Sequence, residues 1–380
     1  MLSLSLVRRL QRMVIQAMAK KYDVVIIGSG VIGSSIAYHL SESKEKEILV
    51  IDKDFPLSGT SGSTQAWVWV HNKTPAWYGE LSMYSAELYP FLEKKIGDVE
   101  YKRTGGIAPF FDEADREKAL RLAEKQAEVG IEIDVLNREQ VLEKEPALSP
   151  NIAGATYSKI DGNVNPFRLV ELYIKASKKN QVQFSFYNPV IDIEKENGIY
   201  KIITKSETYF AKQLILAGGP WTKEIGNMLG VDIPVKQVRG QIIVTEPLAP
   251  ILKHTIGGMR QADNGEVLIG YSKEEVGYDR RTTLDVIQDT AKMAMDYLPD
   301  LAKANIVRCF SGVRVMPNDG LPILGPIPTM DNAYIAVMHS GITLSPLVGT
   351  LMTELLTEGE TSIDLNRLKL DRFNEFNASV

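Results

Sequence analysis

Three glycines stand at the spacing of a phosphate-binding turn in the segment Gly28–Gly33, which reads GSGVIG. Gly28 permits a tight turn, Gly30 lets the backbone approach a pyrophosphate, and Gly33 allows a following helix to pack closely on the preceding strand. A helix that begins here would also direct free N–H groups and the positive end of its dipole toward phosphates. Turns collect glycines for purely structural reasons as well, so the flanking segments decide between the two interpretations.

The flanking segments have the order of a nucleotide-binding unit. The apolar run over 23–27 predicts a strand buried on both faces, 32–40 predicts a helix, and 48–51 predicts a second buried strand that ends at Asp52. An acid at that position accepts hydrogen bonds from the ribose hydroxyls of an adenosine and disfavours a 2′-phosphate. The complete pattern predicts dinucleotide binding, but this motif alone does not choose between FAD and NAD.

The rest of the chain alternates between two kinds of segment. Buried strands are predicted at 213–217 and 334–338, short strands within 182–204, β-rich segments over 237–270, a strand at 306–315, and helices at 77–95, 112–129, 283–297 and 344–356. Dinucleotide-like segments at the start, middle and end predict an α/β fold with a discontinuous Rossmann-type domain. We expect this domain over 21–80, 160–225 and 310–380, interleaved with a mixed β-sheet substrate domain over 81–159 and 226–309, after an N-terminal extension at 1–20.

Further motifs carry a family resemblance. They are the loop Ser58–Ala66, AGGPWT at 217–222, VRGQ at 238–241, GVRVMPNDGLPILGP at 312–326 and HSGITLSP at 339–346. In this order they resemble the D-amino-acid oxidase family of flavoproteins, near its glycine oxidase and sarcosine oxidase branches. The resemblance extends from about Tyr22 to the last predicted helix and implies FAD as the cofactor.

The resemblance also implies which residues contact FAD. Reduced flavin carries negative charge near its N1 and C2 carbonyl, and the N-terminus of the last helix would stabilise that charge. The adenosine half would meet the glycine turn and the end of the second strand, the pyrophosphate the loop after it, and the isoalloxazine the segments that follow. The implied contacts are Gly28, Gly30, Val31, Ile32, Gly33, Asp52, Lys53, Thr60, Ser61, Gln65, Ala66, Trp67, Val190, Gly312, His339, Ser340, Gly341, Ile342, Thr343 and Leu344.

Arg314 occupies the place of the arginine that clamps the substrate carboxylate in glycine oxidases and D-amino-acid oxidases. A planar guanidinium offers two parallel N–H donors to a carboxylate, so it fixes orientation as well as charge. The alternative is a structural ion pair at the end of a strand. The matching motif around Arg314 favours the substrate role.

His339 stands where glycine oxidases tend to carry an arginine, which weakens any transfer of glycine as the substrate. A neutral histidine could accept a proton from the substrate ammonium, which must be lost before a hydride can leave. It could equally orient a flavin carbonyl. Both roles stay open at the level of the sequence.

Cys309, the single cysteine, lies near the position at which sarcosine oxidases attach their flavin covalently. In a regular strand Cys309 and Arg314 face opposite sides, so both reach the substrate only if a bulge at 311–312 intervenes. We therefore expect an inert core cysteine. The sequence also offers weaker pocket candidates, each as well explained by packing or a solvated strand face: Arg239, Met259, Arg260 and Tyr271 from the β-rich region, and Trp67 and Trp69.

Composition limits the remaining possibilities. Among 380 residues the formal net charge is −5 and the basic residues are scattered, so no nucleic-acid face is expected. One cysteine excludes a multi-cysteine metal or iron–sulfur site, and no metal is expected. No window is apolar enough to predict a membrane span. Residues 1–20 are basic and acid-free, as in a mitochondrial presequence, or else an extension before a start at Met18; a cytoplasmic, reducing compartment is the default.

Together these features predict an FAD-dependent oxidoreductase that oxidises the C–N bond of a small amino acid or amine, with oxygen or another electron acceptor. One alternative is a proline-, hydroxyproline- or opine-type dehydrogenase subunit that passes electrons to a partner. Another is a subunit that binds FAD without catalysis, and a nicotinamide-dependent dehydrogenase is a third. A homo-oligomer or a hetero-oligomeric complex is compatible with each of them.

Overall fold

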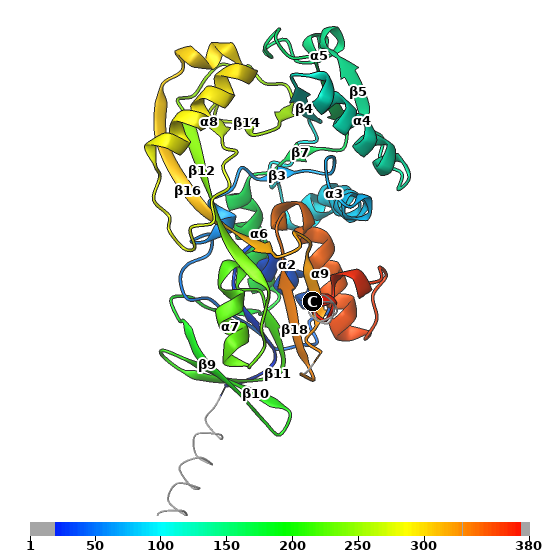
Figure 1. Ribbon diagram of the computed structural model, residues 1–380. Coiled ribbons are helices and arrows are strands. Elements are labelled where there is room, and N and C mark those ends of the chain that lie inside the picture. The colour runs from blue at the N-terminus through cyan, green and yellow to red at the C-terminus, as the bar shows by residue number, and fades with distance from the viewer. Residues whose placement is uncertain (1–19, 329, 374–380) are drawn as a thin grey trace, which may run out of the picture.

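The computed structural model describes residues 20–328 and 330–373, so the predicted extension at 1–20 lies outside the described residues except for Lys20. Within that part of the chain the strands form two eight-stranded sheets and one two-stranded sheet. Figure 1 shows one large sheet below the other, with the short strands β3 (Trp67–Val68) and β7 (Gly162–Asn163) between them. The predicted α/β class with mixed sheets is confirmed.

The first sheet contains the predicted nucleotide-binding strands. In spatial order its members are β17 (Ile323–Pro326), β18 (Ala333–Val337), β11 (Thr208–Leu216), β1 (Lys20–Ile27), β2 (Ile48–Ile51) and β8 (Gln183–Ser185), with β10 (Ile199–Thr204) and β9 (Val190–Glu196) continuing from β11. β1 pairs in parallel with β2 and β11, and β11 pairs in parallel with β18. Their carboxyl ends therefore meet at one edge of the sheet.

Both faces of this sheet are covered, which explains the continuous apolar run of β1. Val24 and Ile26 pack into a cluster with the helices α2 (Val31–Ser41), α3 (Ala76–Ile96), α6 (Pro166–Lys179) and α9 (Gly341–Thr357). Val25 and Ile27 point to the opposite face, where strand β10 and helix α7 (Thr222–Met228) cover them. Successive side chains of a strand alternate between faces, so every position of a strand buried in this way is apolar.

The second sheet is largely antiparallel. Its order is β16 (Ile306–Pro317), β12 (Val235–Thr245), β15 (Val267–Ile269), β14 (Met259–Gln261), β13 (Thr255–Ile256), β4 (Gly106–Phe110), β6 (Gly154–Ser158) and β5 (Asp134–Asn137). Helix α8 (Leu284–Tyr297) and helix α5 (Arg138–Lys144) contribute to its core, and α4 (Glu113–Ala127) lies beside β5 and β6 at the other end of the sheet from α8 (Figure 1). The long pair β12–β16 carries the GVRVMP motif from this sheet toward the first (Figure 1).

Several elements differ from the predicted ones in extent. Helix α9 begins three residues earlier than predicted, and α6 was not predicted at all. Short 3₁₀ helices occupy Thr60–Gly62, Gly219–Trp221, Pro299–Lys303 and Asn366–Leu368. β16 continues across the domain boundary expected at 310, and α3 packs on α9 although most of it falls in the range assigned to the substrate domain. The proposed division into domains stays a prediction.

Candidate active site

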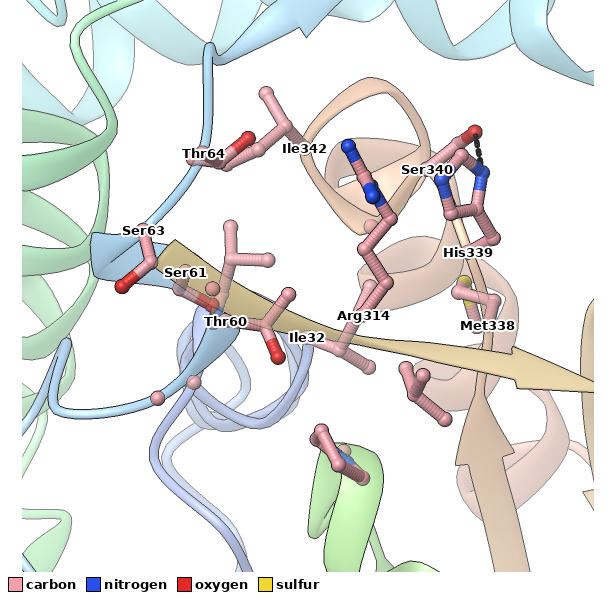
Figure 2. A pocket seen from close by; sticks show the side chains of 18 of the residues that line it. Ile32, Thr60, Ser61, Ser63, Thr64, Arg314, Met338, His339, Ser340 and Ile342 are labelled. Carbon is pink, nitrogen blue, oxygen red and sulfur yellow. Dashed lines mark hydrogen bonds between the residues drawn. The ribbon is translucent and has the colours of Figure 1, made fainter. Parts of the chain in front are cut away.

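A cavity of about 790 Å³ opens at the carboxyl ends of β1, β2, β11 and β18 and continues to the strands β12 and β16 of the second sheet. In α/β proteins ligands bind outside the carboxyl ends of parallel strands, because loops and helix N-termini converge there. Figure 2 shows one part of this cavity, with the loop at Thr60–Thr64, Arg314 from β16 and His339 from the end of β18 around it.

The glycine turn forms the dinucleotide end of the cavity. Gly28 has a positive φ of 113°, and a Cβ there would collide with the carbonyl of Ala217. The Asp52 carboxylate accepts hydrogen bonds from the backbone N–H of Ser29 (2.7 Å) and from its hydroxyl (2.8 Å). Helix α2 has no side-chain cap at Gly30, so its N-terminus faces the cavity with backbone donors.

The loop after β2 lies against this turn. The Ser61 hydroxyl accepts from the backbone N–H of Val31 (3.0 Å), and the Thr60 hydroxyl donates to the carbonyl of Val313 in β16 (2.5 Å). The Gln65 amide donates to the carbonyl of Gly258 (2.7 Å). The loop thus connects the helix N-terminus to the second sheet, and its hydroxyl groups line the cavity between them.

The start of α9 closes the same wall. Ser340 has a left-handed φ of 61°, and Gly341 approaches the side chains of Val31 and Ile32 so closely that an added Cβ would stand 3.4 Å from each. The Thr343 hydroxyl donates to the carbonyl of Trp67 (3.1 Å) and accepts from the backbone N–H of Trp69 (3.1 Å). The N-terminus of α9 is therefore held beside that of α2 and beside β3.

Arg314 enters the cavity from β16. Its guanidinium donates to the carbonyl of Ser272 (2.8 Å) and, at longer range, to that of Arg239 (3.4 Å). Within residues 20–328 and 330–373 it forms no ion pair with a carboxylate. Gly240 makes room for it, since a Cβ there would overlap the guanidinium. Burial lowers the pKa of Arg314, and the nearby charge of Glu274 opposes this.

His339 belongs to a hydrogen-bonded chain of three residues. The Lys73 ammonium donates to the Ser340 hydroxyl (2.5 Å), and that hydroxyl lies 3.0 Å from Nδ1 of His339. Burial lowers the pKa of His339 to about 3, and the positive charges of Lys73, Arg314 and Lys273 act in the same direction. The imidazole is therefore neutral at physiological pH. Burial also lowers the pKa of Lys73, to about 8, against the opposing charge of Asp161.

The cavity brings together most of the predicted contact residues. Those that line it are Gly28, Gly30, Val31, Ile32, Asp52, Lys53, Thr60, Ser61, Gln65, Ala66, Trp67, Val190, Gly312, Arg314, His339, Ser340, Gly341, Ile342 and Thr343. Gly33 and Leu344 do not line it. Gly33 faces the carbonyl of Gly28, which is the close helix–strand packing expected of the third glycine, and Leu344 is buried in the core beneath α9.

The weaker pocket candidates differ in whether they line the cavity. Arg239 is buried in ion pairs with Glu274 (2.5 Å) and Asp279 (3.1 Å), and Met259 lies in the core of the second sheet. Arg260 is buried, donates to Asn163 (3.2 Å), and does not line the cavity. Tyr271 does line it, although 64% of its surface is exposed, which is typical of a residue at an entrance.

The two tryptophans and the cysteine also differ in this respect. Trp67 and Trp69 both line the cavity, with ring centroids 5.2 Å apart. Cys309 is half-buried, does not line the cavity, and packs against the core of the second sheet. The register of β16 with β12 is regular from 309 to 317, so no bulge turns Cys309 toward Arg314. Burial raises the pKa of its thiol, as expected for an unreactive cysteine.

Among the residues that line the cavity and that sequence reasoning missed, Lys73, Lys273 and Gly240 matter most for the surroundings of Arg314. Gly240 lies within the VRGQ motif, so its closeness to Arg314 could have been sought there. Neither lysine belongs to any of the quoted motifs, and an isolated lysine in a loop carries no local signal.

In the described ranges no group of three or more His, Cys, Asp or Glu residues could hold a metal ion. Across those same residues no helix is both long and apolar enough to cross a membrane.

A glycine turn at a helix N-terminus, an acid after the second strand and an adjoining cavity with a half-buried arginine are the features of a dinucleotide-binding oxidoreductase. The chain belongs to the DAO family of FAD-dependent oxidoreductases, whose family model matches residues 23–355. The predicted family, the enzyme class and FAD as the cofactor are thereby confirmed.

Characterised relatives span nearly the whole chain. It is 30% identical to hydrogen cyanide synthase subunit HcnC of Pseudomonas protegens, over 94% of this chain and 97% of that protein. It is 29% identical to one of the opine oxidase subunits of Agrobacterium tumefaciens, over 93% and 98%. The crystal structure of glycine oxidase from Geobacillus kaustophilus superposes with a TM-score of 0.88 at 27% identity, covering 93% of this chain and 99% of that one.

The residues present fit FAD. Gly30, Val31 and Ile32 line the cavity at the N-terminus of α2, where a pyrophosphate would approach the start of the helix and the Ser61 hydroxyl bound to it. The indole N–H of Trp67 is buried without a hydrogen-bond partner among the described residues, so it is free for an acceptor on a bound molecule. A cavity that reaches from Val190 to His339 offers the elongated space that a dinucleotide requires.

Proposed function

We propose that this protein oxidises the C–N bond of a small amino acid or secondary amine whose carboxylate is bound by Arg314. The observation that carries the proposal is the half-buried Arg314, whose side chain lines the cavity beside the dinucleotide loops without a carboxylate partner in the described residues. Bound FAD supplies the acceptor for the hydride that leaves the carbon beside the nitrogen, and water hydrolyses the imine product to an oxo acid and an amine or ammonia.

Arg314 is suited to hold the carboxylate in one orientation. Its hydrogen bond to the Ser272 carbonyl occupies Nη1, and the free donors of the guanidinium are directed into the cavity. A planar cation fixed by a backbone carbonyl binds a carboxylate through two parallel N–H groups. Substrate binding would also compensate the desolvation that lowers the pKa of the guanidinium.

His339 acts in this proposal as a hydrogen-bond donor rather than as a base. Lys73 donates to the Ser340 hydroxyl, so the hydroxyl proton is free to donate to Nδ1 of His339. The remaining nitrogen, Nε2, then carries the proton and can donate to a carbonyl. An imidazole whose pKa is about 3 is too weak a base to take a proton from an ammonium.

The surrounding charges favour a neutral amine. Lys73, Lys273 and Arg314 all act on this part of the cavity, as their common effect on the pKa of His339 indicates. Nearby positive charges disfavour the protonated form of an amine. The bound substrate would thus lose its ammonium proton to solvent at a lower pH than in water, without a dedicated base.

We propose the contacts to FAD as the family resemblance implies them. Val31, Ile32, Asp52 and Lys53 would bind the adenosine half, with the backbone of Val190 beside the adenine. Thr60 and Ser61 would bind the pyrophosphate. Gln65, Ala66, Trp67 and the segment 339–343 would surround the isoalloxazine. Their common exposure to one cavity supports the assignment.

A second candidate is a dehydrogenase subunit that passes electrons to a partner protein. Two of the relatives are named as subunits, of hydrogen cyanide synthase and of opine oxidase, which favours an assembly. In this case the substrate chemistry is unchanged, but reoxidation of the flavin by oxygen is slow.

The test is to follow the flavin absorption of the purified protein under anaerobic conditions while candidate substrates are added. The set would contain glycine, sarcosine, D- and L-amino acids, proline derivatives and opines. Bleaching identifies the substrate class, and the rate of recolouring in air separates an oxidase from a dehydrogenase. A yellow protein that no amine bleaches would contradict the proposal and favour the non-catalytic alternative.

A further inference from the structure

The part of the cavity around Arg314 contains an excess of positive charge. Lys73, Lys273 and Arg314 line it, whereas the acids on the cavity wall, Asp52 and Glu224, stand at the dinucleotide end. Asp52 accepts hydrogen bonds from Ser29, and Glu224 accepts one from a tyrosine hydroxyl. Two acids outside the cavity wall also act on these cations, Asp161 on Lys73 and Glu274 on Arg314, but Asp161 is bound to His71 and Glu274 to Arg239. One carboxylate, held by Arg314, would leave both lysines without a directly bound anion.

Of the two lysines, Lys73 is the one with less access to solvent. It is half-buried, its ammonium donates to the Ser340 hydroxyl (2.5 Å) and lies 4.9 Å from the ring centroid of Tyr78, and it forms no ion pair within the described ranges. Its pKa falls to about 8 because burial penalises the charge. The charge of Asp161, which is bound to His71, opposes this only in part. A cation withdrawn from water is stabilised by an anion with which it can pair directly, and the acids that line the cavity stand at its dinucleotide end.

Lys73 and Arg314 are held at separate points of the wall. Arg314 projects from β16 and is anchored on the carbonyl of Ser272, whereas Lys73 follows β3 and is anchored on Ser340 at the start of α9. Figure 2 shows the Arg314 side chain extending toward the side of the cavity on which His339 and Ser340 lie. The two cations can therefore bind two anionic groups of one small molecule.

Lys273 stands at the entrance. It is exposed, it lines the cavity, and it follows Ser272 directly in the chain. Its neighbour Glu274 is already bound to Arg239, and Glu275 lies near Lys236. A free charge at the mouth raises the local concentration of anions.

We infer that the substrate is a dicarboxylate, in which Arg314 binds the carboxylate beside the reacting carbon and Lys73 binds a second one. The inference rests on the proposed function and specifies its substrate class. That class comprises acidic amino acids and secondary amines with a carboxylate on each side of the nitrogen. A substrate with one carboxylate would leave Lys73 desolvated and unpaired, and so would bind more weakly.

Calorimetric titration of the FAD-loaded protein tests this with ligands that cannot be oxidised. Glutarate and butyrate have nearly the same chain and differ by one carboxylate. We expect glutarate to bind about tenfold more tightly or better, as for one charge-assisted hydrogen bond. In Lys73→Met the ratio of the two Kd values should fall to about two, while Lys73→Arg, which keeps the charge, should retain most of it.

Lys292→Met provides the matched control, because Lys292 is exposed on α8, pairs with Asp296 and does not line the cavity. It should show the ratio of the unaltered protein. Equal binding of glutarate and butyrate by the unaltered protein would overturn the inference, as would a Lys73→Met variant that weakens both ligands equally. The flavin content of each variant shows that it has folded.

A second pair of ligands separates this inference from the proposed function. Iminodiacetate is sarcosine with a carboxylate on its N-methyl group, and both are tested for anaerobic bleaching of the flavin. If sarcosine and monocarboxylic amino acids bleach it while glutarate has no advantage, only the dicarboxylate inference fails. If no amine bleaches it while glutarate retains its Lys73-dependent advantage, the proposed oxidation fails and the dicarboxylate site stands.

Discussion

Arg314 illustrates how one side chain acquires a role from its surroundings. A strand-end arginine would ordinarily pair with an acid, and Arg239 on the neighbouring strand does so with Glu274 and Asp279. Because those acids are taken, Arg314 is left with backbone carbonyls and free donors. The two arginines thus divide a structural role and a proposed binding role between them.

We expect Arg314→Met to raise the Kd of a carboxylate substrate roughly 10- to 150-fold, which corresponds to about 1.5–3 kcal/mol for charge-assisted hydrogen bonds. The concentration dependence of anaerobic flavin reduction measures this. Flavin content should stay at the level of the unaltered protein, since the guanidinium of Arg314 donates to the carbonyls of Ser272 and Arg239, outside the glycine turn. A variant that purified without flavin would show instead that Arg314 supports the cofactor.

The lowered pKa of His339 predicts how the stability of the protein depends on pH. Its folded-state pKa of about 3 lies below the ordinary 6.5, so the unfolded chain binds its proton more readily. The neutral ring therefore contributes its full stability above pH 6.5, and the free energy of unfolding declines as the pH falls from 6.5 toward 3. We expect His339→Asn to weaken the decline in the free energy of unfolding between pH 7 and pH 4, as measured by urea denaturation. An unchanged slope would argue that solvent reaches the ring in the folded protein.

At the scale of elements, the β1–α2 turn requires a glycine at position 28 for two reasons: its φ is positive, and a Cβ would have no room. Gly28 has φ 113° and no room for a Cβ, whereas Gly198, in the β9–β10 turn, has φ 79° with nothing within 4 Å of an added Cβ. We expect Gly198→Ala to cost about 1 kcal/mol of folding free energy through φ strain alone. Gly28→Ala should cost more than about 3 kcal/mol and lose FAD.

Flavin absorbance per mole of protein and the urea midpoint, measured on both variants, check this comparison. Equal destabilisation of the two would mean that the turn relaxes and that the collision with Ala217 is unimportant. Retention of FAD by Gly28→Ala would likewise show that the turn does not need to approach the cofactor closely.

Helix α6 is an element that the sequence patterns did not predict. Its N-terminus carries a recognisable signal, because the Asn165 side chain accepts from the N–H groups of Phe167 and Arg168, and Pro166 takes the first helical position. Attention to the Asn-Pro pair would have predicted it. The early start of α9 had no such signal, since Ser340 adopts a left-handed φ that its own residue type does not favour.

At the scale of the whole molecule, one cavity joins both large sheets. Gly28 and Asp52 belong to the first sheet, and Gly240 and Arg314 to the second. A ligand that contacts both should stabilise them together. We expect FAD added to the apoprotein at 100 times its Kd to increase the free energy of unfolding by about 2.7 kcal/mol, in a single transition.

Differential scanning calorimetry of the apoprotein with and without FAD measures this effect. Two separated transitions, of which FAD shifts only one, would show that the sheets unfold independently and that the cofactor is bound by the first alone. The Gly28→Ala variant serves as the control, because its transition should respond less to added FAD.

The sequence by itself determined the nucleotide-binding unit, the α/β class and the family, because these depend on local patterns: glycine spacing, apolar periodicity and motif order. It also placed Cys309 away from Arg314, since alternation along a strand is local. Only the tertiary structure decided which cations share a cavity. Lys73, Lys273 and Arg314 come from three distant segments, which meet because the residues after β3, the residues after β15 and the strand β16 line one cavity. The pKa of His339 was decided at the same level, because burial and neighbouring charge are properties of the assembled fold.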